Sequence, residues 1–478
     1  MLSPKQCLLI LVVLTFGVYS PSLVNGFAYD DMDIVRVPSV SGFPNHMVAE
    51  VQPIGDYYSG YYGESVAGLG RGYRPTTVLS WALVHAVTKR PAESVPPDAA
   101  RASAGPQHFV NILLHCFAVW LTFRMLSLLA GGGFGPVLGA AVFGLHALRS
   151  DPVLSLVGRG EILGYLFGVL GLLGYVAALR RSGGGRYCYL AGTGLALFLA
   201  FTSKESAAPW VVFLPLFVLA MAWLGRDGAP TPMQQLLPWL VGVLTPFLVF
   251  LGLYLSVTSD LGDFSPAYES NPLWYLPDQR FGTGVMLMGY AIYKLLVPFS
   301  LACDYGAEVF TMVESLADSR FLLAFALLLG LLAFGLLRAT RHPLLFLATA
   351  AFFGFSLLVS NIPFPIETIF AERLYYTPTL ACSFLVAWLA GRLGGTRLQT
   401  SGVWSLGLWC AVCSLVILKR DFNWRDNASL FAADVVSQPR SISMLLSQRD
   451  MLEFQHPGQW KQVLDKAYAL SPTSPFVL

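Results

Sequence analysis

Long apolar runs dominate this chain and limit what it can fold into. A helix needs about 20 apolar residues to cross the hydrocarbon core of a bilayer. Runs of this kind cover residues 7–24, 110–130, 134–148, 153–179, 187–202, 208–225, 237–257, 284–301, 321–338, 343–360, 376–392 and 403–419. Only 12% of the residues are charged, 55% are hydrophobic, and the mean hydropathy is +0.60. Soluble domains carry about 25% charged residues, so the sequence predicts an all-α polytopic membrane protein.

Basic residues between the runs predict which side of the membrane each loop faces, because Lys and Arg collect on the cytosolic side. Lys5 places the amino terminus in the cytosol, and RRSGGGR at 180–186 marks a cytosolic loop. The later basic loops fit this rule only if 284–301, which holds Lys294 and Pro298, is an interfacial or re-entrant segment. Eleven crossings result, and the tail after the last crossing is luminal.

Two further features concern the ends of this membrane region. The first apolar run could be a cleaved signal peptide, but no small-x-small cleavage site precedes Phe27, which favours a retained helix. The sequon Asn427-Ala428-Ser429 lies in the predicted luminal tail, where its asparagine would be glycosylated.

Cysteine and histidine patterns do not point to a metal centre. The seven cysteines fall mostly in apolar runs and predict no disulfide framework. Cys410 and Cys413 have CxxC spacing but lie in a lipid-buried run without a second pair, and His108 and His115 lack further ligands. The residues predict no metal site and no required cofactor, and they do not exclude a divalent metal.

Polar side chains that bilayers disfavour fall mostly on the predicted luminal side. Any one of them could be a helix-end residue in water, but charges beside membrane helices usually face a cavity or each other. The set consists of Asp30, Asp31, His146, Arg149, Asp151, Arg159, Glu161, Lys204, Glu205, Glu367, Glu372 and Arg373. Their convergence on one face predicts a polar cavity that opens to the lumen.

This mixture of acids and bases at a bilayer surface is typical of transfer from a lipid phosphate. We expect Arg159, Lys204 and Arg373 to hold the phosphate leaving group by charge-assisted hydrogen bonds. A carboxylate at Asp30 or Asp31 would accept the proton of an acceptor hydroxyl as general base. A groove between helices would hold the lipid tail, and the luminal loops would hold the acceptor.

Residues 27–106 form a large first loop on the luminal side. From Thr76 to Val87 its apolar residues recur at helical spacing, which predicts a helix lying on the membrane surface. The tyrosines of this loop are interface anchors or sugar-stacking residues, and they are Tyr57, Tyr58, Tyr61 and Tyr62.

A series of short motifs, taken in order, resembles a known family. They are YDD at 29–31, GYRP at 72–75, HFVNILLH at 108–115, FGLH at 143–146, VGRGEIL at 157–163, TSKES at 202–206, SNIPFPIETIFAERLYYTP at 360–378 and NWRDNASLF at 423–431. Over about residues 8–431 the chain resembles the transmembrane and tetratricopeptide-repeat-containing protein O-mannosyltransferases (TMTC-like). VGRGEIL, SKE and AERLYY are the most specific of these motifs.

The resemblance implies a GT-C type glycosyltransferase fold with about 11 transmembrane helices. Residues 1–420 would form the catalytic membrane domain and 421–478 a short luminal helical tail. The implied partners are dolichyl-phosphate mannose as donor, Ser or Thr hydroxyls of secretory-pathway proteins as acceptors in the endoplasmic reticulum, and membrane lipids, with no nucleic acid. Motif positions assign Asp30 and Asp31 to catalysis, and they assign the donor or substrate site to His146, Arg159, Glu161, Lys204, Glu205, Glu372 and Arg373.

The chain departs from the family in two places. Where the family usually reads HP-hydrophobic-HTEAV, this chain reads HALRSDPV at 146–153, so an acid is kept at Asp151 but a second His is absent. The tail is also short, and residues 441–472 could form at most one tetratricopeptide repeat, whereas about three repeats are needed to bury a core.

Two other functions remain open at the level of sequence. One is another lipid-phosphate-sugar glycosyltransferase, because these residues do not identify the sugar. The other is a non-enzymatic scaffold or transporter, although transporters favour repeated halves with charges near the bilayer midplane, and this chain has no internal repeat.

Overall fold

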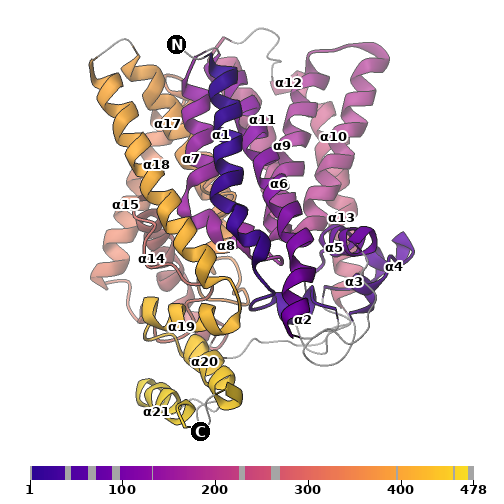
Figure 1. The fold of residues 1–478 in the computed structure, drawn as a ribbon. Coiled ribbons are helices and arrows are strands. Elements are labelled where there is room, and N and C mark those ends of the chain that lie inside the picture. The colour runs from indigo at the N-terminus through magenta and orange to yellow at the C-terminus, as the bar shows by residue number, and fades with distance from the viewer. Residues whose placement is uncertain are drawn as a thin grey trace.

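The computed structural model describes residues 3–37, 45–62, 72–88, 97–131, 133–225, 232–259, 268, 270–394, 397–455 and 458–471. Within these residues every regular element is helical, and most helices run side by side as a bundle (Figure 1). The bundle contains α1 (Pro4–Tyr19), α6 (Pro97–Ala130), α7 (Gly135–Leu145), α8 (Ser150–Leu154), α9 (Arg159–Leu179), α10 (Gly183–Ser203), α11 (Trp210–Trp223), α12 (Pro232–Trp239), α13 (Thr245–Thr258), α14 (Pro277–Leu296), α15 (Ser319–Leu337), α16 (Pro343–Leu357), α17 (Leu380–Leu393) and α18 (Arg397–Asn423).

The remaining described α-helices lie at one end of the bundle, in the segments that connect or follow the bundle helices. They are α2 (Asp31–Ile34), α3 (His46–Ala49), α4 (Ile54–Ser59), α5 (Pro75–Thr88), α19 (Asn427–Ser437), α20 (Ile442–Gln455) and α21 (Trp460–Leu470). The helix predicted at Thr76–Val87 is confirmed as α5, whose Trp81 is fully buried while Leu83 and Val87 are exposed.

Seven helices of the described chain are long and apolar enough to cross a membrane. The bent pair formed by residues 135–145 and 147–154, with 51° between its halves, makes an eighth candidate. An eleven-crossing topology would need three more crossings, and the shorter apolar helices α16 and α17 and the 21-residue α10 are the helices available for them. The predicted class, an all-α polytopic membrane protein, is confirmed.

Proline shapes two of the less regular membrane segments. Pro238 and Pro246 flank a π-helical turn, Leu240–Leu244, which links α12 to α13 because proline cannot complete the regular hydrogen-bond ladder. Helix α14 ends just before Pro298 and does not meet the length and composition test for a membrane span. The expectation that 284–301 does not cross stays a prediction.

The amino and carboxyl ends lie at opposite ends of the bundle (Figure 1). Helix α1 runs from the end marked N toward the end that carries α2, and α18 runs toward the end that carries α19. An odd number of crossings would place the two ends of the chain on opposite sides of the membrane. The assignment of the amino terminus to the cytosol stays a prediction.

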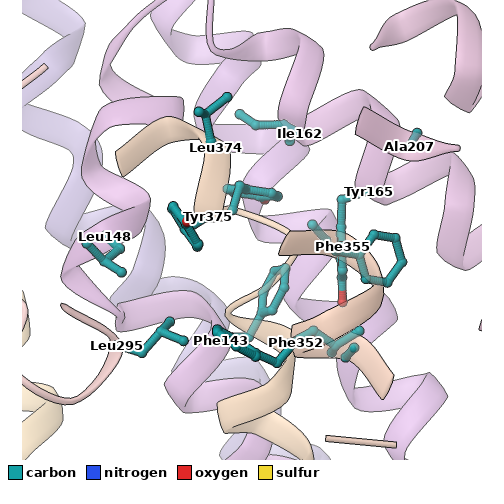
Figure 2. Packing of buried hydrophobic residues seen from close by; sticks show 14 of the residues in the cluster. Phe143, Leu148, Ile162, Tyr165, Ala207, Leu295, Phe352, Phe355, Leu374 and Tyr375 are labelled. Carbon is teal, nitrogen blue, oxygen red and sulfur yellow. The ribbon is translucent and has the colours of Figure 1, made fainter. Parts of the chain in front are cut away.

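One apolar core runs through the bundle, and the segment Glu372–Tyr375 lies against α8 and the turn Ala147–Arg149. Figure 2 shows Phe143, Tyr165 and Tyr375 among its packed side chains. The rings of Phe143 and Tyr165 stack with centroids 4.4 Å apart. Gly158 permits the close contact of α8 and α9, because a Cβ there would lie 2.4 Å from the carbonyl oxygen of Pro152. The core therefore sets the positions of the charged side chains at the end of the bundle.

The tail begins as part of this core and then separates from it. Leu430 and Phe431 of α19 and Met444 of α20 belong to the main core cluster, so packing continues across the predicted domain boundary at 420/421. Helices α20 and α21 pack on each other around a small second cluster. They match the position expected for a single repeat, while Pro472 lies outside the described residues.

Candidate functional site

Charged side chains from distant segments meet at the end of the bundle where α1 and α10 finish. The site is formed by the residues preceding α2, those preceding α5, the turn between α8 and α9, the segment after α10, and the segment preceding α17. Hydrogen bonds and ion pairs join some of these segments in pairs: Asp31 to the turn before α9, Arg74 to Glu205, and Lys204 to Glu161.

Asp31 is a buried structural acid. Its side chain is 1% exposed and accepts hydrogen bonds from the backbone N–H of Leu156 (3.0 Å) and Val157 (2.8 Å) and from the hydroxyl of Ser155 (3.3 Å). Burial raises the pKa of Asp31 to about 7, and these hydrogen bonds oppose the rise. Asp31 therefore ties α2 to the turn that begins α9, and its oxygens are already occupied.

Asp30 has different surroundings although it is the adjacent residue. It is partly exposed, and no other described side chain or N–H donates a hydrogen bond to its carboxylate. Burial raises the pKa of Asp30, and the positive charge of Arg373 is the strongest influence that lowers it. An accessible carboxylate with a raised pKa is suited to accept a proton.

The backbone just before Asp30 is strained. Tyr29 has φ of +54°, in the left-handed region where a non-glycine residue costs roughly 1–2 kcal/mol. Its N–H donates to Oδ1 of Asn427 at 2.6 Å, and its ring packs against Phe431. Strain that the surrounding structure maintains is common at functional sites.

Arg373 is the positively charged residue with the largest effect on the pKa of Asp30. It lies in the turn before α17, is partly exposed, and donates from Nη1 to the carbonyl of Cys303 at 2.7 Å. Its guanidinium carbon is 5.8 Å from the ring centroid of Tyr29. Burial opposes its charge, but Tyr29, Asp151 and Asp30 keep the pKa of Arg373 above its usual value.

Lys204 and Glu161 form a buried ion pair between α10 and α9. Nζ of Lys204 lies 2.8 Å from Oε1 of Glu161, and the hydroxyl of Ser206 donates to Oε2 at 3.1 Å. Lys204 is 8% exposed, so one edge of the pair reaches the open face of the site. The predicted donor residues Lys204 and Glu161 are thus brought together.

Arg74 is a cation of the site that the sequence reasoning did not assign. It precedes α5, and its Nε lies 3.1 Å from Oε2 of Glu205, whose Oε1 accepts from the N–H of Tyr73 at 2.7 Å. The guanidinium also lies over the ring of Tyr62, at 4.5 Å. Its position in the GYRP motif, next to the tyrosine-rich segment, was the available signal.

Arg159 lies inside the helical bundle. The sequence reasoning gave it a direct contact with a phosphate, but its side chain is fully buried. Its guanidinium donates to Oδ1 of Asn111 (2.7 Å) and to the carbonyls of Gln107 (2.9 Å) and Ser80 (3.3 Å). These bonds join α5, α6 and α9, so Arg159 stabilises the arrangement of these three helices next to the site.

His146 and Glu372 are also enclosed, which argues against the substrate contact predicted for them. His146 Nε2 pairs with the carbonyl of Leu295 at 2.9 Å, and Nδ1 accepts from the N–H of Leu148 at 3.2 Å. Glu372 is fully buried and accepts hydrogen bonds from the N–H of Ala302 and the hydroxyl of Tyr305. Both residues fix the path of the chain beneath the site.

The variant segment HALRSDPV places Arg149 and Asp151 inside the fold. The Arg149 guanidinium carbon lies 3.2 Å from the ring centroid of Phe143 and 4.3 Å from that of Tyr376. Asp151 is 1% exposed and interacts electrostatically with Arg373 and Arg420. This segment therefore places a buried acid, Asp151, within electrostatic reach of Arg373.

No group of three or more His, Cys, Asp or Glu side chains arranged for a metal ion occurs within the described residues. The seven cysteines, which the structure describes in full, are free thiols.

Fold and site together define a multi-pass membrane protein with a partly open acid, Asp30, and two partly open arginines, Arg74 and Arg373, at one end of its helical bundle.

No protein-family model matches the chain. Curated proteins match it over most of its length. Protein O-mannosyl-transferase TMTC3 of Homo sapiens is 24% identical over 458 residues, which cover 89% of this chain and 47% of that protein. Protein O-mannosyl-transferase Tmtc3 of Drosophila melanogaster is 24% identical, covering 82% and 47%. Protein O-mannosyl-transferase F38B6.6 of Caenorhabditis elegans is 21% identical, covering 96% and 63%.

These matches confirm the resemblance to the TMTC-like family that the motifs indicated. The chain spans about half the length of the curated relatives it matches. Among solved structures, archaeal oligosaccharyltransferase AglB from Archaeoglobus fulgidus, in complex with an inhibitory peptide and a dolichol-phosphate, aligns with 99% of this chain and 60% of its own. The TM-score of that alignment is 0.39 at 12% identity.

Proposed function

We propose that this chain is a GT-C type protein O-mannosyltransferase of the endoplasmic reticulum membrane. It moves mannose from dolichyl-phosphate mannose to Ser or Thr hydroxyls of secretory-pathway proteins. The names of its curated relatives support the reaction class. The observation that carries the proposal is the partly exposed Asp30 carboxylate at the end of a membrane bundle, where Arg373 is the strongest positive influence on its charge.

The residues divide the reaction between an acid–base side and a phosphate side. Asp30 accepts the proton of the acceptor hydroxyl, whose oxygen forms a bond to C1 of mannose while the bond from C1 to the phosphate oxygen breaks. Dolichyl phosphate leaves with the bonding electron pair and carries a negative charge. Arg373 and Arg74, which are the partly exposed arginines of the site, stabilise this charge.

Each arginine is held in place by a contact that leaves several of its N–H donors available. Arg74 is bound on one edge by Glu205, and Arg373 donates one Nη1 bond to a backbone carbonyl. Each guanidinium has five N–H donors, so others are left for a phosphate. Lys204, which Glu161 neutralises, contributes at most its partly exposed edge.

The test is a transfer assay on the purified chain in lipid nanodiscs. The donor is dolichyl-phosphate mannose with a radiolabelled sugar, and the acceptors are Ser/Thr-rich peptides from secreted proteins. We expect transfer by the wild type and a loss of about 10²–10⁴-fold in kcat for Asp30→Asn, the range that general-base catalysis supplies.

Asp33→Asn is the matched control, because Asp33 is a partly exposed acid on the same short helix. It should keep wild-type activity. Transfer of a different sugar from its dolichyl phosphate, with none from the mannose donor, would favour another glycosyltransferase. Binding of donor without any transfer would contradict an enzymatic role.

A further inference from the structure

The motif NWRDNASLF at 423–431 has no role in the chemistry described so far. It covers the end of α18 and the start of α19, and it lies against the segment that leads from the first helix to the acidic pair. The contacts between the two segments are specific and involve both backbone and side chains.

Four hydrogen bonds to residues 421–427 hold the segment before Asp30. Asn25 donates from Nδ2 to Oδ1 of Asp421 at 2.8 Å, and it donates also to the carbonyl of the same residue at 3.0 Å. The N–H of Gly26 donates to the carbonyl of Arg425 at 3.0 Å. Nearest to Asp30, the N–H of Tyr29 donates to Oδ1 of Asn427 at 2.6 Å.

The last of these bonds acts where the backbone is strained. Tyr29 has φ of +54°, and the residue that follows it is the accessible acid. A left-handed residue sets the local direction of the chain, so relaxing it would change the direction in which the Asp30 side chain leaves the backbone. The Asn427 side-chain oxygen binds the N–H of the strained residue itself and is therefore well placed to maintain this conformation.

We infer that Asn427 is a positioning residue, which holds Tyr29 in the left-handed conformation and thereby aims Asp30 at the reacting hydroxyl. This inference rests on the proposed function. Asn427 contacts neither donor nor acceptor and acts only through the backbone of Tyr29.

The same residue is the asparagine of the sequon predicted to be glycosylated. In the folded chain it is partly buried at the start of α19, with its amide group facing the Tyr29 backbone. A glycan on Nδ2 would place a large sugar beside this contact. Positioning and glycosylation therefore compete, and we expect Asn427 to be unmodified in active protein.

Three variants test the inference in the transfer assay. Asn427→Ala should lower kcat at least tenfold while KM for the donor stays within about twofold, because donor contacts are kept. Asn427→Asp keeps an acceptor oxygen in the same place and should recover most of kcat. Ser429→Ala destroys the sequon but leaves Asn427, and it should match the wild type. Mass spectrometry of the active wild type should find Asn427 without a glycan.

The outcomes separate the two proposals. An active wild type with Asn427→Ala at wild-type kcat would overturn the role of Asn427 alone, as would full glycosylation of Asn427 in active protein. Equal losses in Asn427→Ala and Asn427→Asp would also overturn it, because a retained acceptor oxygen should matter. A wild type that transfers no sugar to any acceptor would overturn the proposed function and the role of Asn427 together.

Discussion

Asp30 and Asp31 are adjacent in sequence, yet their chemical surroundings differ in almost every respect. Asp31 is enclosed and receives hydrogen bonds at both oxygens, whereas Asp30 is partly exposed beside a cation. A motif of two acids assigns both to catalysis because it carries no information on which tertiary partner each will meet. The structure therefore indicates a structural role for Asp31 and leaves Asp30 as the candidate base.

The first prediction at this scale concerns Asp31. Asp31→Asn replaces one accepting oxygen with an NH₂ group, so one buried N–H of the 155–157 turn loses its acceptor. An unpaired buried donor costs about 1–3 kcal/mol. Thermal unfolding at pH 8 should show a lower Tm for Asp31→Asn and an unchanged Tm for Asp33→Asn. An unchanged Tm for Asp31→Asn would contradict the structural role.

A second prediction concerns pH. A general base works in its ionised form, so transfer should fall as the pH drops through the pKa of Asp30, which burial raises above the ordinary aspartate value. Arg373 lowers this pKa, so Arg373→Met should move the acid limb of the kcat profile to higher pH. Arg373→Lys keeps the charge and should leave the limb near its wild-type position. A limb that Arg373→Met does not move would argue against the influence of Arg373 on Asp30.

At the scale of elements, buried charges hold the bundle together at its charged end. Arg159 joins three helices, and the pair of Lys204 with Glu161 joins two. The sequence reasoning treated every such charge as a substrate contact because an isolated membrane charge is costly. Internal hydrogen bonds remove that cost equally well, and only the three-dimensional contacts distinguish the two uses.

The ion pair between α9 and α10 can be tested as a unit. Removing one partner leaves an uncompensated buried charge, which costs about 3–5 kcal/mol, whereas removing both can be nearly neutral. We expect Lys204→Met and Glu161→Gln each to lower Tm markedly and the double variant to recover most of the loss. Additive losses in the double variant would show that the pair does not couple the helices.

Across the whole molecule, the apolar runs were sufficient to predict an all-helical membrane protein, because crossing helices are specified by local composition. The gathering of polar motifs at one end was also predictable, since alternating crossings return every second loop to the same side. The hydrogen bonds of Arg159, the cation at Arg74 and the contact from Asn427 to Tyr29 depend on packing between distant segments. A local motif can mark such a residue, as GYRP marks Arg74, but it does not identify the residue's partner in the fold.

The contacts of the tail with the membrane bundle were also not predictable from the sequence. The crossing count and the family resemblance predicted a separate luminal tail after 420, but α19 contributes Leu430 and Phe431 to the main core. Asp434 of α19 pairs with Arg420 of α18 at 2.5 Å and accepts from the N–H of Cys303 at 2.7 Å. The start of the tail is therefore part of the unit that positions Asp30.

The central claim is that Asp30, and not Asp31, accepts the proton of the acceptor. The most direct test measures mannose transfer by Asp30→Asn and Asp31→Asn side by side, with each rate divided by the amount of folded protein. The account predicts a loss of about 10²-fold or more for Asp30→Asn at unchanged Tm, and a much smaller loss per folded molecule for Asp31→Asn at lowered Tm. Wild-type transfer by folded Asp30→Asn would contradict it.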